Sequence, residues 1–489
     1  MSDLDRRTLL RGAAAVAGGT VLGGPFLGFV NRDTAAAQVA GRAPLVDSVA
    51  DLRDGKVRLH VPAGFQYRSF HDTEAPVVLD DGTALPGRHD GMGAFRDRGD
   101  SVVLIRNHEV NNPGPAFGPR TPYDPQARGG TTTVQVSRTG VVGRAYTSVN
   151  GTMMNCSGGQ MPWGSWVTCE ETVNGPDVGP DFTNASNVPL TQPHGYVFEV
   201  PVRGEASGEP ITAAGRFTHE AVAYDPHSGY LYLTEDSFEF PSGFYRYKPR
   251  RDPMKVGHLD NQGRLQMLAV RNRPNIHLEA DQRRGATYDV KWVDIDDPAP
   301  RFPYTPGEQA PTTNDDATVY VPKQGWAQGA AYFSRLEGAA YDDGVVYFTS
   351  TQGGGAAETE LGPHAVGGYG NGSGQIWAYY PKHQVLRAIY QSPGPDTLDF
   401  PDNVTTSPRG TLVVCEDNTN DNYLRGLTRQ GELFDIALNR LTSSTGTSRF
   451  NDEFAGSTFS PDGHTLFVNI QAGAGMTFAI WGDWRKIGV

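Results

Sequence analysis

The sequence predicts an all-β fold, a six-bladed β-propeller with long loop insertions. The 489-residue chain contains 60 glycines and 35 prolines, which favour short strands joined by tight turns over long helices. A unit of strands, a tight turn and a polar end recurs six times. Its copies begin 54 to 65 residues apart, with one longer interval of 117, which is typical of four-stranded blades with loops.

The N-terminal residues 1–37 have the pattern of a twin-arginine signal peptide. Arg6 and Arg7 precede a weakly apolar stretch, Gly12–Val30, and a small-residue cleavage site that ends at Ala37. This route exports folded proteins, often with a cofactor already bound. We therefore expect the twin-arginine translocon as a partner during export, and a periplasmic or extracellular location.

Residues 38–489 are expected to form a single propeller domain. The segment Val57–Phe70 could complete a blade together with C-terminal strands. Residues 250–330 are rich in Pro, Asp and Arg, and we interpret them as outer strands of one blade with long loop insertions. The glycine-rich loop 352–374 lacks the Gly-Lys-Ser/Thr of a phosphate-binding loop.

Acidic residues stand at the ends of the repeated units. The six copies span residues 98–109, 158–171, 220–236, 337–351, 402–418 and 456–471. Equivalent strand ends converge on one face of a propeller, so these acids should meet there. The acidic candidates are Glu109, Glu170, Glu171, Glu220, Asp236, Glu337, Asp402, Glu416 and Asp417. So many carboxylates repel one another unless cations neutralise them, and the pattern therefore predicts several bound metals. For each acid alone, a solvated turn is the alternative.

Only three cysteines occur, Cys156, Cys169 and Cys415, so an exported chain of this kind is not built on disulfides. Cys169 lies at a polar strand end beside two acids, which suits a ligand of a borderline metal such as iron. Cys156 and Cys415 are interpreted as small core residues.

The charge balance excludes several partners. The formal net charge of −13 becomes −14 without residues 1–37, so nucleic acid and anionic membranes are poor partners. We expect a monomer with no stable membrane insertion. Arg335 is the one cation within the acidic series, and its planar fork suits a phosphate or carboxylate ligand. Its alternative role is to pair with a neighbouring carboxylate.

At these residues the sequence resembles the PhoX-type alkaline phosphatases. The matching stretches are 107–109, 163–171, 217–222, 333–338 and 401–403. The resemblance implies a twin-arginine-exported enzyme that hydrolyses phosphomonoesters at a buried cluster of Fe³⁺ and Ca²⁺. It implies Cys169 as an iron ligand, Glu220 and Glu337 as carboxylate ligands, and Arg335 as the phosphate-binding arginine, with Arg335 and Glu337 as catalytic residues. Further ligand positions are implied at Glu109, Glu170, Asp236, Asp402 and Glu416. Residues 250–330 do not align with the family pattern.

Two other functions fit a propeller of this composition. One is a calcium-dependent hydrolase of another type, lactonase or phytase-like, and the other is a non-catalytic exported binding protein. Cys169 and the export signal favour the iron-containing phosphatase, because a site for calcium alone needs no thiolate.

Overall fold

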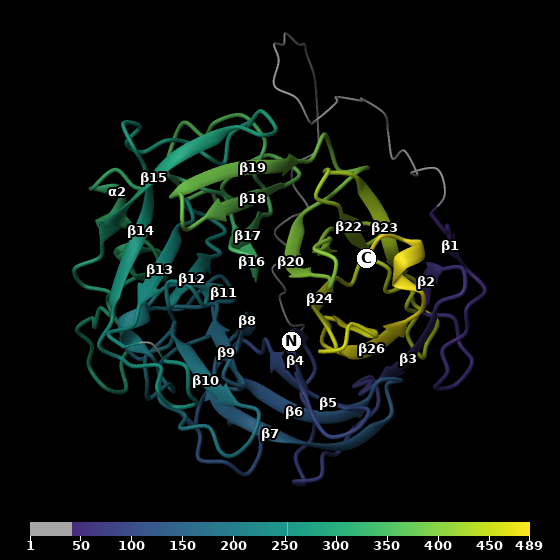
Figure 1. Cartoon of the computed structure of the whole chain (residues 1–489). Coiled ribbons are helices and arrows are strands. Elements are labelled where there is room, and N and C mark those ends of the chain that lie inside the picture. The colour runs from purple at the N-terminus through teal and green to yellow at the C-terminus, as the bar shows by residue number, and fades with distance from the viewer. Residues whose placement is uncertain (1–41, 252) are drawn as a thin grey trace.

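The computed structural model describes residues 42–251 and 253–489, so the predicted signal peptide lies outside the described residues. The chain forms an all-β, propeller-like ring of sheets with few helices (Figure 1). The predicted fold class is confirmed at this level. The strands are arranged in five hydrogen-bonded sheets.

The first two sheets along the ring are antiparallel meanders. One contains β4 (His89–Arg96), β5 (Ser101–His108), β6 (Gly129–Ser137) and β7 (Val142–Thr152). The next contains β8 (Asn155–Met161), β9 (Ser165–Glu170) and β10 (Val197–Pro201).

A nine-stranded sheet follows, in which two meanders are joined edge to edge by the pairing of β15 with β19. The first meander contains β11 (His219–Asp225), β12 (Tyr230–Glu235), β13 (Phe244–Lys248), β14 (Arg264–Val270) and β15 (Thr287–Asp294). The second contains β16 (Leu336–Asp342), β17 (Val345–Ser350), β18 (Gln375–Tyr380) and β19 (Val385–Gln391).

The last two sheets each recruit strands from near the N-terminus. One contains β20 (Pro401–Thr406), β21 (Leu412–Glu416), β22 (Tyr423–Leu427) and β23 (Leu433–Asn439), extended by β2 (Leu59–Pro62) and β1 (Leu45–Val46). The other contains β24 (Phe454–Phe459), β25 (Thr465–Ile470) and β26 (Met476–Trp481), followed by β3 (Gln66–Phe70). The pairings β26–β3 and β23–β2 confirm that Val57–Phe70 completes sheets with C-terminal strands, which closes the ring and protects otherwise open edges.

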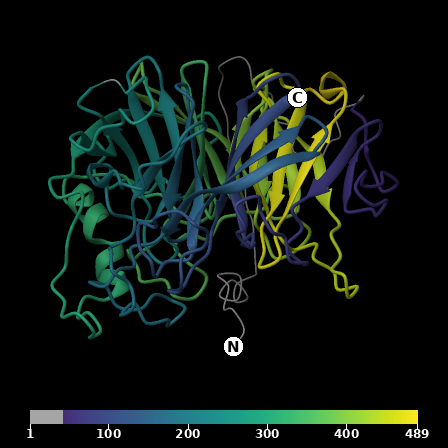
Figure 2. The same cartoon turned by 90° about the horizontal axis from the view of Figure 1, so that it is seen from below.

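Residues 250–330 contain β14 and β15 and also two short helices that the sequence analysis did not expect. These are α1 (Asn314–Thr318) and α2 (Tyr320–Trp326), at the outer edge of the ring (Figure 2). Val321 and Trp326 of α2 pack into a hydrophobic cluster with strands β11 to β14, which anchors the insertion. Two 3₁₀ turns, Thr212–Ala214 and Trp484–Lys486, complete the helical structure described.

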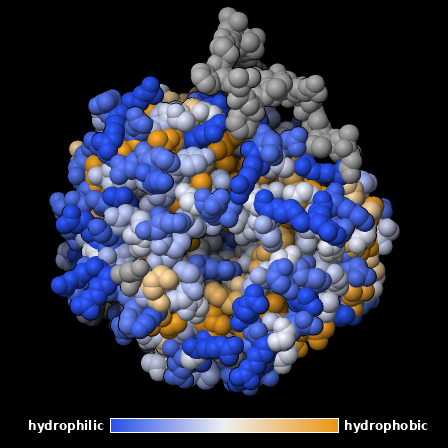
Figure 3. Space-filling view, in the orientation of Figure 1, coloured by the Kyte–Doolittle hydropathy of each residue, from blue (hydrophilic) through white to orange (hydrophobic). Residues whose placement is uncertain are grey.

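Six strands surround the centre of the ring. Strand β4 contacts β8, β8 contacts β11, and the series continues through β16, β20 and β24 back to β4 (Figure 1). The hydrophobic clusters fill the spaces between sheets, and the face shown in Figure 3 is largely hydrophilic with scattered apolar side chains. Within residues 42–251 and 253–489, the helices are too short to cross a lipid bilayer.

Candidate metal centre and phosphate site

Each of the six innermost strands contains the same irregularity near its beginning. Where it pairs with the next strand, the register shifts between two residues, as in a β-bulge. The shifts fall at His89/Met92, Asn155/Gly158, His219/Val222, Leu336/Ala339, Pro401/Val404 and Ala455/Thr458. A bulge redirects the side chain of its extra residue, and bulges are frequent beside functional sites. The first residues inside these shifts are Asp90, Cys156, Glu220, Glu337, Asp402 and Gly456.

Small residues follow five of these six positions and let the strands converge. They are Gly91, Ser157, Ala221, Gly338 and Ser457, and Asn403 follows the remaining position. A Cβ atom at Gly338 would lie 2.5 Å from the backbone nitrogen of Val404, and one at Gly456 would lie 2.3 Å from the carbonyl oxygen of Asp90. Gly456 also has φ near +60°, a conformation that favours glycine. At its bulge the sixth strand therefore brings backbone, and no acidic side chain, to the centre.

The bulged residues form two overlapping groups with the chemistry of metal ligands. The Sγ atom of Cys156 and carboxylate oxygens of Glu171 and Glu220 lie within 4.8 Å of one another. Carboxylate oxygens of Glu220, Glu337 and Asp402 form the second group at the same spacing. All five side chains are buried, and Glu220 belongs to both groups.

The Glu220 carboxylate has no conventional hydrogen-bonding partner in the described part of the chain. Neither of its oxygens accepts a hydrogen bond from a nitrogen or oxygen donor, although the side chain is fully buried. Burial, followed by the negative charges of Glu171 and Glu337, raises the pKa of Glu220 well above its usual value. A buried carboxylate is normally paired or hydrogen-bonded, so this group requires a proton or a cation.

The neighbouring acids are perturbed in the same direction. Burial and the charge of Glu337 raise the pKa of Asp402 well above its usual value. Burial also raises the pKa of Glu337 to about 7, although Arg335 opposes this shift. Burial and the charge of Asp90 raise the pKa of the Cys156 thiol. The cluster is therefore built to hold positive charge, because without it the carboxylates and the thiol retain protons.

A second tier of side chains follows the second strand of each meander. The residues directly after β5, β9, β12, β17, β21 and β25 are Glu109, Glu171, Asp236, Thr351, Asp417 and Gln471. Glu109 and Asp236, both predicted site residues, stand in this tier. The predicted residues Glu170 and Glu416 are the last residues of their strands, one position earlier.

Glu170 has a different role from Glu171. Its carboxylate accepts hydrogen bonds from the backbone nitrogens of Met153, Gly195 and Tyr196, and lies 2.6 Å from Nδ1 of His194. Although burial disfavours the charged imidazole, Glu170 and Asp124 raise the pKa of His194 to about 9. With all its partners in the protein, Glu170 supports the loop that follows β9.

Glu416 is likewise occupied by partners within its own sheet. It accepts hydrogen bonds from Nε of Arg425 at 2.9 Å and from the backbone nitrogens of Asp399 and Tyr423. The next residue, Asp417, lines the central cavity. At both acidic pairs the structure thus places the second acid, and not the predicted first one, at the site.

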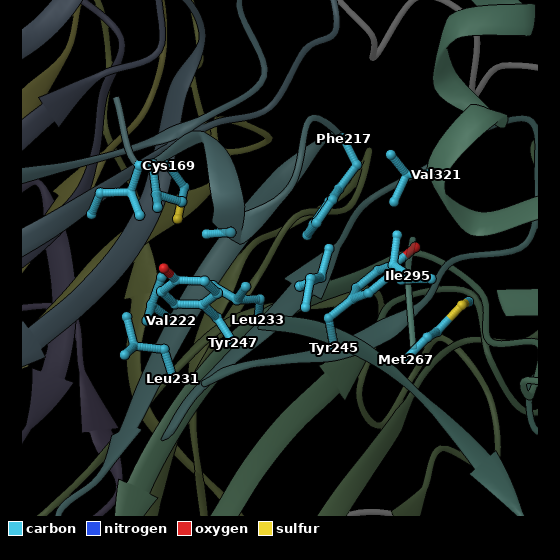
Figure 4. Packing of buried hydrophobic residues seen from close by; sticks show 14 of the residues in the cluster. Cys169, Phe217, Val222, Leu231, Leu233, Tyr245, Tyr247, Met267, Ile295 and Val321 are labelled. Carbon is cyan, nitrogen blue, oxygen red and sulfur yellow. The ribbon is translucent and has the colours of Figure 1, made fainter. Parts of the chain in front are cut away.

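The structure places the predicted cysteine outside the two groups of candidate ligands. Cys169 is fully buried in a hydrophobic cluster with Val167, Phe217 and Val222 (Figure 4). Successive side chains of a strand point to opposite faces, so Cys169, which pairs regularly with Val197 of β10, points away from the surroundings of Thr168 and Glu170. Cys156, interpreted from sequence as a core residue, is the cysteine that joins the carboxylates.

The position of Cys169 has a structural role elsewhere in the ring. The equivalent residues, two places before the second tier, are Asn107, Thr234, Thr349, Cys415 and Asn469. Four of them donate hydrogen bonds to the carbonyl oxygen of the bulged residue in the next meander: Asn107 to Cys156, Thr234 to Glu337, Thr349 to Asp402, and Asn469 to Asp90. These bonds hold the backbone of the candidate ligands in place.

Two arginines face the same narrow cavity from opposite sides of the ring. Arg335 directly precedes β16 and Arg88 directly precedes β4, and both have left-handed backbones, with φ of 40° and 48°. Nη2 of Arg335 lies 3.0 Å from Asp236 and 2.7 Å from Glu337. Arg88 donates from Nε to the backbone carbonyl oxygen of Glu109 and from Nη2 to the Glu109 carboxylate. Strands β4 and β16 are three steps apart in the ring of six, so the arginines approach the centre from opposite sides.

The central cavity is small and strongly polar. Its volume is about 30 Å³, and it is lined by Arg88, Glu109, Cys156, Glu171, Arg335, Glu337, Asp402, Asp417, Glu453 and Gln471. Sequence reasoning missed Arg88, Asp90, Cys156 and Glu453. A signal for two of them is present, because Arg88-His-Asp-Gly91 repeats the pattern of Arg335-Leu-Glu-Gly338.

Comparison with known families gives a match over most of the chain. The profile of the family described as alkaline phosphatase PhoX matches residues 45–147 and 140–474, which is most of the chain. This chain belongs to the PhoX family. The resemblance inferred from sequence motifs is thereby confirmed, and membership implies a phosphatase. A comparison with curated proteins finds no match.

Solved structures resemble the PhoX-family chain in fold. Pseudomonas fluorescens PhoX, in complex with vanadate as a transition state analogue, has a TM-score of 0.62 and 16% identity, over 94% of this chain and 98% of that one. A streptogramin B lyase has a TM-score of 0.40 and 10% identity, over 86% and 98%. A gluconolactonase of Xanthomonas campestris has a TM-score of 0.36 and 11% identity, over 90% and 99%. At these identities the first structure supports the fold alone, and the other two carry no argument about function.

Proposed function

We propose that this PhoX-family chain is an exported, metal-dependent alkaline phosphatase that hydrolyses phosphomonoesters and releases inorganic phosphate. The observation that carries the proposal is Glu220. This buried carboxylate lies within reach of both ligand groups and has no nitrogen or oxygen donor for either of its oxygens. A metal shared between the two groups would satisfy it.

The donor atoms fit the ions that the family resemblance implies. Thiolate suits a borderline metal, so we propose Fe³⁺ beside Cys156, Glu171 and Glu220. Carboxylates alone suit hard cations, so we propose Ca²⁺ beside Glu337 and Asp402, with Glu220 shared and second-tier acids completing the shell. When bound, such ions supply Lewis-acid polarisation of phosphoryl oxygens and an oxygen nucleophile at accessible pH.

The arginines supply the charge and geometry that bind phosphate. Arg335 presents a planar fork that can donate two hydrogen bonds to a phosphoryl group, and its contact with Asp236 orients the guanidinium. Donors fixed in this way stabilise charge on the equatorial oxygens as the alcohol leaves. Arg88 offers a second fork from the opposite side. The central cavity of about 30 Å³ is narrow and lined by charged side chains, so we propose that it receives the phosphoryl end of the substrate.

The raised pKa values predict how metal binding, and with it the activity, changes with pH. Ligands must lose their protons to hold a metal, so metal binding is coupled to proton release. Since the pKa of Glu337 is raised to about 7 before any cation binds, metal affinity should fall as the pH falls through this range. This behaviour is consistent with an enzyme that works at alkaline pH.

We also propose that the ring consists of six blades. The nine-stranded sheet consists of two meanders linked at one edge, and each begins with its own innermost bulged strand. Together with the other four sheets this makes six radial units around one axis. The twin-arginine signal peptide, and with it the periplasmic or extracellular location, also stays a proposal.

The two alternative functions have less support. A calcium-only hydrolase or a calcium-stabilised binding protein would be expected to use oxygen ligands, and Cys156 is an unsuitable ligand for calcium. No feature of the described residues favours lactone chemistry over phosphate chemistry, whereas two arginines at the cavity favour phosphate.

The decisive experiment combines elemental analysis with an activity assay on protein exported in its native form. We expect iron and calcium in the purified protein, together with hydrolysis of p-nitrophenyl phosphate. A chelator should abolish this hydrolysis, and adding iron and calcium back should restore it. Full activity in metal-free protein, or no hydrolysis by metal-loaded protein, would contradict the proposal.

A further inference from the structure

A second cavity lies next to the arginine side of the metal centre. Its volume is about 350 Å³, roughly ten times that of the central cavity. Its walls come from three regions: the loop at residues 180–182, Thr218 just before β11 with the loop 236–240 after β12, and helix α1 with its preceding residue Thr313. The insertion at residues 250–330, which lies within the stretch matched by the family model, thus forms one wall of the cavity.

Arg335 and Asp236 connect this cavity to the candidate phosphate site. Asp236 lines the larger cavity and pairs with Arg335, which lines the smaller one. The Arg335 guanidinium carbon also lies 5.7 Å from the centre of the Phe238 ring, a wall of the larger cavity. A phosphate held by Arg335 would therefore have its alcohol portion beside Phe238.

The cavity combines aromatic walls with an excess of negative charge. Phe182, Phe238 and Phe240 supply the aromatic surface. Four carboxylates line the cavity, and Lys, Arg and His are absent from its lining. Asp236 is neutralised by Arg335, whereas Glu239 and Asp315 form no ion pair with any basic side chain of the described chain.

Asp315 lies close enough to Glu239 to oppose ionisation of the Glu239 carboxyl group. Burial raises the pKa of Glu239, and the charge of Asp315 raises it further. Burial also raises the pKa of Asp315. These acids do not converge as a metal-ligating group in the described residues, so their field suits a diffuse organic cation better than a bare ion.

Two buried hydroxyl groups point to a ligand. The side chains of Thr218 and Ser237 line the cavity and are only 8% and 4% exposed. Their hydroxyl oxygens have no hydrogen-bonding partner within residues 42–251 and 253–489. Buried polar groups are nearly always satisfied, so these hydroxyls are suited to a polar atom of a bound molecule, such as the ester oxygen.

We propose that this cavity holds the alcohol portion of the substrate and selects phosphomonoesters whose alcohol carries an alkylammonium group. The proposal rests on the proposed phosphatase function. Aromatic faces and flanking carboxylates are the features that recognise quaternary ammonium ions. An alcohol with a carboxylate or a second phosphate would instead be repelled.

Binding of the free alcohol tests the cavity without any catalysis. Calorimetry with the full mature protein should show saturable choline binding that weakens about tenfold in the double variant Glu239→Gln/Asp315→Asn. The matched control is Glu308→Gln, which changes an exposed acid of the same insertion outside the cavity, and it should bind choline as the wild type does. No saturable binding, or equal weakening in the control, would overturn the inference.

A matched substrate pair tests selection. Choline phosphate and its neutral isostere 3,3-dimethylbutyl phosphate differ only in charge, and we expect about tenfold higher kcat/KM for choline phosphate. The double variant should bring this ratio close to one, while Glu308→Gln should keep it. Equal kcat/KM values in the wild-type protein would overturn the inference, even if p-nitrophenyl phosphate is hydrolysed well.

The two proposals fail in different ways. If metal-loaded protein hydrolyses no phosphomonoester, the proposed function is wrong. The binding experiment still decides the cavity in that case. Choline binding that depends on Glu239 and Asp315 supports a cation site, and its absence refutes one.

Discussion

Strands β8 and β9 are hydrogen-bonded neighbours, and each carries a cysteine, yet the two thiols have different surroundings. Cys156 lies within the register shift of β8 and joins Glu171 and Glu220. Cys169 lies on the unbulged strand β9 across from that shift, pairs regularly with Val197 of β10, and packs among apolar side chains. A place in the bulge, more than closeness to acids in the sequence, therefore decides which side chains reach the centre.

The largest expected effect comes from the carboxylate that both ligand groups share. Glu220→Gln should lower kcat/KM for p-nitrophenyl phosphate by about a thousandfold or more and reduce the content of both metals. The metal-free variant should be more stable than metal-free wild type by about 1 kcal/mol or more, because a buried, repelled acid is removed. Denaturant unfolding in chelator measures this difference, and a less stable variant would argue against the proposed charge repulsion.

Neighbouring acids offer a matched pair that sharpens the comparison. Glu171→Gln should lose metal and about a hundredfold in activity while folding normally. Glu170→Gln should keep the ligand set but lose about 3–5 kcal/mol of stability, because it breaks the buried pair with His194. Metal content and unfolding free energy separate the two effects. The same changes in metal content and stability in both variants would contradict the different roles assigned to Glu170 and Glu171.

The arginines should affect turnover and leave the metals in place. Arg335→Ala is expected to lower kcat/KM about a hundredfold to a thousandfold with unchanged metal content. Arg88→Ala should lower kcat/KM by about tenfold, since Arg88 is proposed as the second fork. Elemental analysis beside steady-state kinetics checks both variants. Loss of metal in Arg335→Ala would mean that Arg335 supports the cluster and does not act on phosphate.

The smallest effect concerns pH and the support of Glu170. The pKa of His194 is raised to about 9, so its pairing contributes stability that is fully present below about pH 6.5 and is lost as the pH rises through about 9. His194→Gln should therefore destabilise the protein by about 1–3 kcal/mol at pH 6.5 and by less at pH 9.5. Unfolding curves at both pH values measure the change. An equal loss at both would show that the histidine is neutral.

The predicted repeats include many of the candidate site residues because four of the six copies begin at a bulged residue. Copies starting at 220, 337, 402 and 456 begin at Glu220, Glu337, Asp402 and Gly456. The first two copies, starting at 98 and 158, begin after the bulged residues Asp90 and Cys156. A bulge interrupts the alternation of apolar and polar residues from which the boundaries of the copies are predicted. The sequence therefore predicts a loop position for Asp90 and a core position for Cys156.

Other features of the site cannot be read from local sequence. The choice between Glu170 and Glu171, or between Glu416 and Asp417, depends on where strand pairing stops, and both members of each pair are acidic. Helix α1 has only five residues, in a segment rich in turn-forming side chains, so no periodicity indicates it. The wall that it adds to the larger cavity follows from tertiary packing alone.

The central claim is that the bulged positions hold the metals, and the two cysteines test it most directly. Iron should be measured per chain in Cys156→Ser and Cys169→Ser, purified in their native exported form beside the wild type. We expect Cys156→Ser to lose most of its iron and its activity. Cys169→Ser should keep both and lose only stability. Iron retained in Cys156→Ser and lost in Cys169→Ser would contradict the central claim.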